Sequence, residues 1–274
     1  MPVDAELRLL EIDIPAQPEA LVKLSLLLAE EDVDLKALAS LIESDMALAA
    51  AVLKAVNSSL YGLSGRVQSV QQAITYLGTR EVAAVTFEMG LRAVFPHAPE
   101  LGPIWDRAAR RGVLMGRIAA ALGVDPWVAH SAGLFEECGK AVLFRHASTR
   151  YKPLLAEADG DEVALTQLEH AEFGVSHDKL GAALCESWGL AAAAVASVRH
   201  HVEVQATREL PANVQRRAVC ALSALAHALM TAPDSVEEVA QLVAPQAQLD
   251  EVLVVRGARK IEAQLDAAAA RATA

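Results

Sequence analysis

Aromatic side chains are scarce in this chain: Phe, Trp and Tyr together make up 4% of its 274 residues. The apolar fraction is nevertheless 53%, and much of it is Ala and Leu. Ala and Leu favour helices, whereas the Val, Ile, Tyr and Phe that favour strands are comparatively few. The composition therefore predicts an all-α protein, and the length is sufficient for one large or two modest domains with real cores.

Runs of basic residues are also absent, and the formal net charge is −11. Contacts from Lys and Arg to phosphates supply most of the non-specific affinity for nucleic acids. Single-stranded nucleic acids also need aromatic side chains on which bases can stack. We therefore expect no binding to DNA or RNA, and we expect a protein partner instead.

The sequence shows neither a signal peptide nor a membrane-spanning run. Its first residues lack a basic start and an apolar core, and no apolar run reaches membrane-spanning length without charge. The three cysteines, Cys138, Cys185 and Cys220, are far apart and odd in number. Free, buried thiols in a reducing compartment explain them. These features predict a cytoplasmic protein with no membrane partner.

Apolar residues recur at helical spacing between capping residues along most of the chain. N-caps are predicted at Asp34 and Thr79, and capping boxes at Ser69 with Gln72 and at Ser235 with Glu238. The block 57–59 is interpreted as a helix end and turn. We expect the Ala-rich tail after residue 265 to fray.

A cluster of Pro and Gly at positions 96, 99, 102 and 103 marks a boundary between two groups of predicted helices. We therefore predict an N-terminal helical lobe over residues 1–98 and a second helical lobe over residues 99–274. Pro103 is expected in the first turn of the long helix that opens the second lobe.

The residues that could take part in chemistry lie between positions 131 and 201. Glu136 and Glu137 are adjacent within a frame of small and apolar residues, and His177 shares a helix face with apolar side chains. His200 and His201 are neighbours on one predicted helix. Because adjacent helical residues diverge by about 100°, both imidazoles can line one cavity only from its two sides.

Several blocks of the sequence together resemble the HDOD (HD-related output domain) family of bacteria. In order, these blocks are Leu41–Ala49, Asn57–Gly62, Ser69–Gly78, Gly133–Lys140, His177–Gly181, Trp188–Leu190 and His200-His201. The resemblance implies an all-helical protein in two lobes, the second related to HD and HD-GYP phosphohydrolases. It also implies an output or scaffold module of bacterial signalling, in a family whose members often lack detectable enzymatic activity.

The same resemblance shows where this chain departs from an HD-type metal centre, in which imidazoles and a carboxylate hold one or two metals that activate water. The first His ligand falls near Arg107, and a guanidinium cannot ligate a metal. The central His-Asp pair aligns with Glu136 and Glu137. The distal Asp falls in a helix that contains no Asp and only His227.

Three histidines that HD-GYP proteins use survive. The resemblance therefore implies a vestigial HD-type pocket of Arg107, Glu136, Glu137, His177, His200 and His201. In one interpretation, the imidazoles form hydrogen bonds that stabilise the lobe. Arg107 either pairs with Glu136 or Glu137, which the family register favours, or is a surface residue of an amphipathic helix. A second is a residual metal site of Glu137, His177, His200 and His201, since borderline metals accept such ligands. A third is a polar pocket for a small phosphorylated ligand.

Together these features predict a non-enzymatic signal-transduction module with no catalytic residues and no cofactor, which binds a signalling protein whose identity the sequence does not give. The alternatives are a metal-dependent phosphodiesterase with altered ligands and a sensor of a nucleotide or another small effector. No Gly-x-Ser-x-Gly turn, Gly-rich phosphate loop or His-Glu-x-x-His helix is present.

Overall fold

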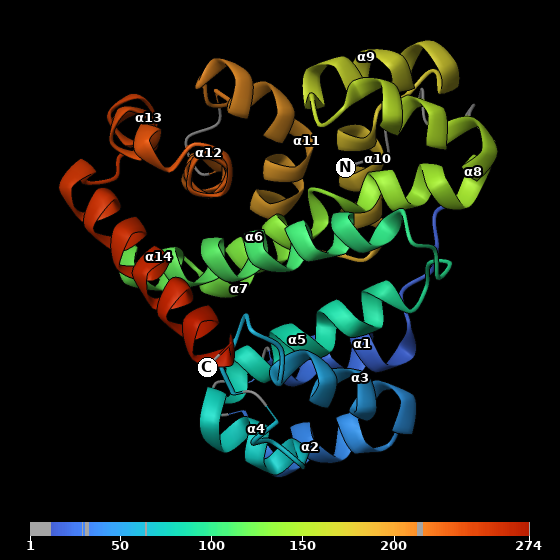
Figure 1. The fold of residues 1–274 in the computed structure, drawn as a ribbon, viewed down its shortest axis with the longest axis vertical. Helices are drawn as coiled ribbons and strands as arrows, with labels where there is room; N and C mark the ends of the chain where they lie inside the picture. Colours follow the sequence, from blue (N-terminus) through green and yellow to red (C-terminus); the bar gives the residue numbers. More distant parts are fainter. Residues whose placement is uncertain (1–11, 29, 31–32, 64, 213–215, 274) are drawn as a thin grey trace. The chain divides into compact units, whose positions relative to one another are not determined.

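The computed structural model describes residues 12–28, 30, 33–63, 65–212 and 216–273 (Figure 1). This part of the chain contains helices and no strand, which confirms the all-α prediction. The α-helices are α1 (Glu19–Leu28), α2 (Leu35–Glu43), α3 (Met46–Val56), α4 (Val70–Leu77), α5 (Thr79–Arg92), α6 (Leu101–Leu122), α7 (Pro126–Phe135), α8 (Cys138–Ala158), α9 (Glu162–Phe173), α10 (His177–Ser187), α11 (Ala192–Thr207), α12 (Arg217–Thr231), α13 (Val236–Val243) and α14 (Glu251–Thr273).

The described chain divides into two compact units. One contains residues 12–16 and 95–261, and the other contains residues 17–94 together with 262–273. The chain thus changes unit at Gln17, at Phe95 and again within α14. The predicted division into lobes at residue 98 stays a prediction.

The unit of residues 17–94 contains α1 to α5, whose ends follow the local capping chemistry. The Asp34 side chain accepts a hydrogen bond from the Lys36 backbone N–H at 2.8 Å. Ser69 Oγ accepts one from the Gln72 N–H, while Gln72 Oε1 accepts one from the Gln68 N–H, so the capping box is displaced by one residue on its return side. The N-cap predicted at Thr79 is wrong. Gly78, whose φ of 84° is positive, precedes α5, and Thr79 is the first helical residue.

Asn57 closes the loop that follows α3. Its amide nitrogen donates to the carbonyls of Leu53 and Val67, and its amide oxygen accepts from the Val67 N–H. These three hydrogen bonds use both donors and one of the two acceptor positions of the amide group. The interpretation of the block 57–59 as a helix end and turn is confirmed.

In the unit of residues 95–261, α6 and α7 run side by side (Figure 1). Pro103 lies in the first turn of α6, and Gly123 ends that helix in the left-handed conformation with φ of 71°. Asp125 then caps α7 by accepting hydrogen bonds from the N–H groups of Trp127 and Val128. These local signals fix where α6 ends and where α7 begins.

Helices α8 and α10 approach each other closely at Gly139. A Cβ atom built on Gly139 would lie 1.8 Å from the His177 carbonyl oxygen, so no larger residue fits there without movement of a helix. Farther along, α8 contains one non-helical residue, Ala147, which divides it into two helical segments. The close approach brings the start of α10, with His177, beside the start of α8.

The capping box predicted at Ser235 with Glu238 is wrong. Ser235 does not cap α13, because its hydroxyl donates to the Ala232 carbonyl within a short 3₁₀ turn. The Ala-rich tail is helical as far as Thr273. The three cysteines are free and buried, as predicted. No helix in the described residues is long and apolar enough to cross a membrane.

Candidate functional site

Glu136 and Glu137 occupy the two-residue junction between α7 and α8. Their exposed fractions are 0% and 1%, so both carboxyl groups are removed from water. Burial of a charged carboxylate is costly unless hydrogen bonds and opposite charges compensate it. The partners of these two side chains therefore decide what the site can do.

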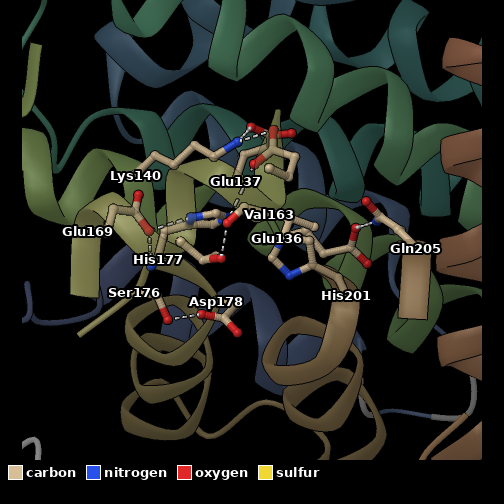
Figure 2. A network of polar contacts seen from close by, with 12 residues as sticks. Glu136, Glu137, Lys140, Val163, Glu169, Ser176, His177, Asp178, His201 and Gln205 are labelled. Carbon is tan, nitrogen blue, oxygen red and sulfur yellow. Dashed lines mark hydrogen bonds and ion pairs between the residues drawn. The ribbon is translucent and has the colours of Figure 1, made fainter. Parts of the chain in front are cut away.

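Glu137 is surrounded by three cationic groups of the chain itself. Arg111 Nη1 donates to its Oε1 at 2.9 Å, and Lys140 Nζ donates to its Oε2 at 2.9 Å, the contact drawn in Figure 2. Arg107 Nη2 donates to Oε2 at 3.1 Å, which is the pairing expected for Arg107. Burial alone would raise the pKa of Glu137, but the charges of Lys140, Arg111 and Arg107 hold it well below its usual value. Glu137 is therefore ionised at neutral pH.

Glu136 has a different and weaker set of partners. Gln205 Nε2 donates to its Oε2 at 3.1 Å (Figure 2), and Ser197 Oγ donates to its Oε1 at 3.3 Å. Arg111 Nε lies 3.4 Å from Oε2. Burial raises the pKa of Glu136 to about 7, although the Arg111 charge acts in the opposite direction. The two adjacent carboxyls thus differ in charge near neutral pH.

Lys140 extends the network to α9 by donating to Glu162 Oε1 at 2.6 Å. The other oxygen of Glu162 lies 3.4 Å from His177 Nε2. Burial would raise the pKa of Glu162, but the charges of Lys140 and His177 lower it. Asp161, whose side chain accepts from the N–H groups of Val163 and Ala164, caps α9 and fixes the position of Glu162.

His177 is fully buried and held from its Nδ1 side by Glu169. Glu169 Oε2 accepts from both the Nδ1 and the backbone N–H of His177, each at 2.7 Å (Figure 2). Tyr151 donates its hydroxyl to Glu169 Oε1 at 2.5 Å. Burial lowers the pKa of His177, but the Glu169 carboxylate outweighs burial and raises it. Such a buried chain of hydrogen bonds fixes the imidazole in one orientation.

His201 packs beside His177, with ring centroids 5.3 Å apart, and its exposed fraction is 2%. Its Nδ1 lies 2.7 Å from the Val198 carbonyl oxygen, which can only accept, so Nδ1 carries the proton. Burial and the nearby charge of His177 lower the pKa of His201 to about 3, which keeps it neutral. His177 and one member of the histidine doublet, His201, are therefore both buried.

His200 lies outside this cluster. Its side chain is 36% exposed, and its Nδ1 faces Glu203 of the same helix at 3.4 Å. The reason is the divergence of adjacent helical side chains, which directs only one of the two imidazoles inward. The structure therefore brings together five of the six residues of the predicted pocket: Arg107, Glu136, Glu137, His177 and His201.

Sequence reasoning missed four charged members of the network: Arg111, Lys140, Glu162 and Glu169. Arg111 follows Arg107 by one helical turn and therefore shares its face of α6. Glu162 and Glu169 are two turns apart after the capping residue Asp161, which also places them on one face. These spacings were available signals, but the sequence could not show which other helices the two faces contact.

The donors present do not resemble a divalent metal site. Arg107 cannot ligate, the Glu137 carboxylate is engaged by three cations, and the Nδ1 of His201 carries a proton toward a carbonyl. Within the residues that the structure describes, no group of three or more His, Cys, Asp or Glu side chains is arranged to hold a metal ion. The metal-site interpretation of Glu137, His177, His200 and His201 thus finds no matching geometry there.

Comparison with known proteins gives a family match. The model of the HDOD domain matches residues 14–204. A curated relative, an uncharacterized protein of Treponema pallidum (strain Nichols), is 28% identical over 193 residues, which are 69% of this chain and 37% of the relative. The chain thus spans little more than a third of that relative's length.

Solved structures share the fold. A protein of Marinobacter aquaeolei VT8, named provisionally for signal transduction, has a TM-score of 0.73 at 23% identity, over 96% of this chain and 60% of that one. A protein of Shewanella amazonensis SB2B, named provisionally as a phosphohydrolase, has a TM-score of 0.69 at 18% identity, over 98% of both chains. At these identities the similarity establishes the fold alone.

Proposed function

The chain belongs to the HDOD family, and we propose that it is a non-enzymatic output or scaffold module of bacterial signal transduction. The family is related to the HD phosphohydrolases, so the proposal needs a physical reason for the loss of chemistry. The contacts around Glu137 give the proposal its strongest support. Two ionised donors, Arg111 and Lys140, contact its two oxygens at 2.9 Å each, and Arg107 adds a third cation.

These cations stand where the family resemblance would place a metal. A divalent ion polarises water and a phosphoryl oxygen and must therefore contact them directly. The Arg and Lys side chains satisfy the carboxylate without presenting a Lewis acid to water. A divalent ion at Glu137 would have to displace Arg111 and Lys140, two buried cations that would then lose a carboxylate partner, which is unfavourable.

Other positions support the same proposal. The central His-Asp pair is replaced by Glu136 and Glu137, and the pKa of Glu136 is raised to about 7 by burial, so it is a poor anionic ligand at neutral pH. The helix expected to carry a distal Asp is α12, whose sequence contains no acidic residue. Loss of one ligand or of its supporting partner commonly lowers metal affinity or activity about 10- to 100-fold. Several losses together remove the activity.

In the proposed role the buried charges are structural. Glu137 and its partners join α6 to the junction of α7 and α8, and Lys140 and Glu162 join α8 to α9. A rigid helical module of this kind acts on a pathway by binding another signalling protein. The identity of that protein is open, and the cytoplasm is the compartment we propose.

Hydrolysis assays test the proposal. The protein, purified without chelator, is incubated with a cyclic dinucleotide, bis-p-nitrophenyl phosphate or p-nitrophenyl phosphate, and with Mn, Mg, Fe, Ni or Zn added in turn. We expect no turnover above a blank without protein. The His177→Ala variant, which changes the buried histidine, is compared with His170→Ala, which changes an exposed histidine of α9.

Turnover that disappears in His177→Ala and persists in His170→Ala would overturn the proposal in favour of a metal-dependent phosphodiesterase. Turnover that is equal in both variants and the wild type would instead identify a contaminating enzyme. Circular dichroism of both variants verifies that they are folded.

A further inference from the structure

A cavity of about 690 Å³ opens onto the charged network in the unit of residues 95–261. Side chains of α6, α8, α9 and α12 line it. This volume lies within the range of small-molecule sites, roughly 300–1,000 Å³. It is larger than an inorganic ion needs, so an organic ligand would be required to fill it.

The lining is basic although the chain as a whole is acidic. Five basic side chains face the cavity, namely Arg107, Arg110, Arg111, Lys140 and Lys152, against three acidic ones, Glu100, Asp106 and Glu162. Within this lining the positive charges exceed the negative ones by two, and the ionised Glu137, which contacts three of the cations, reduces this excess to one. The chain as a whole has a net charge of −11. A local excess of this kind attracts anions.

Several donors of these cations remain available to a ligand. The Arg110 guanidinium is exposed and has no hydrogen bond or ion pair to any residue that the structure describes. Arg107 uses Nε and Nη2 for Glu137, which leaves Nη1. Lys140 has three N–H donors and uses two, for Glu137 and Glu162.

The same lining includes four apolar side chains, those of Ile104, Leu155, Leu165 and Met230. His227 on α12 also lines the cavity. Burial and the charge of Arg111 lower the pKa of His227 to about 4, so its imidazole is neutral and adds no charge. Basic and apolar side chains in one lining suit a ligand with an anionic group on an organic body.

We propose that this cavity binds a small organic molecule with a phosphate group, the phosphate on Arg107 and Arg110 and the organic part against the apolar side chains. A phosphate monoester carries about −1.5 to −2 charges and three strong acceptor oxygens. Both properties match the local excess of positive charge and the free donors. A carboxylate, with one charge and two oxygens, matches them less well. This binding site goes beyond the proposed non-enzymatic role, and the two proposals can fail separately.

Isothermal titration calorimetry at low salt tests the site with phenyl phosphate as the probe and with inorganic phosphate and phenol as separate partial probes. We expect phenyl phosphate to bind, inorganic phosphate to bind more weakly, and phenol not to bind. The Arg110→Ala variant should bind phenyl phosphate about tenfold more weakly, because it lacks a charge-assisted contact. The matched control is Arg256→Ala, an exposed arginine of α14 outside the cavity, which should bind like the wild type.

The site is refuted if the wild type does not bind phenyl phosphate, or if Arg110→Ala binds it as tightly as Arg256→Ala does. Equal affinity for inorganic phosphate and phenyl phosphate would refute the apolar part of the site. Release of phenol is monitored in the same samples. Binding with phenol release would support the binding site and overturn the non-enzymatic role. Absence of both binding and phenol release would refute the binding site and leave the non-enzymatic role unchanged.

Discussion

At the scale of single residues, the adjacent carboxyls of Glu136 and Glu137 have opposite pKa shifts. Both are buried, but Glu137 has three cationic partners and Glu136 shares only Arg111. Because burial acts on both in the same direction, the number of nearby positive charges decides the sign. The following two predictions depend on this difference.

Glu137→Gln should strongly destabilise the fold. The substitution removes the negative charge but leaves the buried cations of Arg111 and Lys140 without it, and breaking a buried ion pair in this way costs about 3–5 kcal/mol. Urea unfolding monitored by circular dichroism measures the change. Glu19→Gln, which removes the exposed pair with Lys23, is the control and should change little. A loss for Glu137→Gln as small as that of the control would contradict the network's role.

Glu136 should make the protein less stable as pH rises. Its pKa is about 7 in the folded protein against 4.5 for an unperturbed Glu, so the folded state retains a proton that the unfolded state releases between these values. Below about pH 4.5 Glu136 is protonated in both states. Above about pH 7 the free energy of unfolding is lower by the full contribution of this group, roughly 3 kcal/mol. Glu136→Gln is neutral at every pH. The free energy of unfolding of Glu136→Gln, minus that of the wild type, should therefore rise from pH 4.5 to 7 and stay constant above pH 7. Parallel pH profiles of the two proteins would contradict the raised pKa.

The sequence identified part of this cluster. The pairing of Arg107 with a Glu and the burial of His177 and one of the doublet could be predicted from the family register and helical spacing. Arg111 and Lys140 could not, because their value as partners depends on the distance between α6 and the start of α8. Charged residues on a helix are solvent-exposed by default, and only the packed structure shows the exceptions.

At the scale of elements, the approach of α8 to α10 at Gly139 determines the position of His177 relative to the network. The Cβ of any larger residue would overlap the His177 backbone, which cannot move without moving α10. By contrast, a Cβ on Gly257 of α14 would lie 3.7 Å from its nearest neighbour, an ordinary contact distance. The two glycines therefore make a matched pair.

Gly139→Ala should destabilise the protein by at least about 3 kcal/mol, since overpacking against rigid backbone is among the costliest substitutions. Gly257→Ala should be neutral or should stabilise by up to about 1 kcal/mol, because Gly is entropically unfavourable inside a helix. Thermal and urea unfolding of both variants provide the comparison. Equal effects of the two substitutions would show that the close approach of α8 and α10 is not required.

The most predictable features were helix starts at which a side chain accepts a hydrogen bond from a backbone N–H two or three residues later. Asp34, Ser69 and Asp125 cap helices in that way, and each is recognisable within three or four residues of sequence. Thr79 and Ser235 are also residue types that favour N-caps, but neither side chain caps a helix. Gly78 already ends one helix and begins the next, and a 3₁₀ turn precedes α13. Local signals cannot distinguish these cases when two helices adjoin.

At the scale of the whole molecule, the all-α fold was predictable from composition and spacing, because Ala and Leu dominate a chain with regular capping residues. The division into two units was not fully predictable. The C-terminal residues 262–273 belong to the unit of residues 17–94, although they are far away in sequence. Such a long-range assignment depends on tertiary packing, which no local pattern encodes.

We propose that side-chain cations of the chain replace a metal at the junction of α7 and α8. The transition-metal content of the protein tests this most directly. It is measured by inductively coupled plasma mass spectrometry on protein purified without chelator, before and after dialysis against Mn, Fe, Ni or Zn. We expect no stoichiometric metal that survives removal of the free ion. One or more metal ions per chain, retained by the wild type and by His170→Ala but lost from His177→Ala, would contradict it.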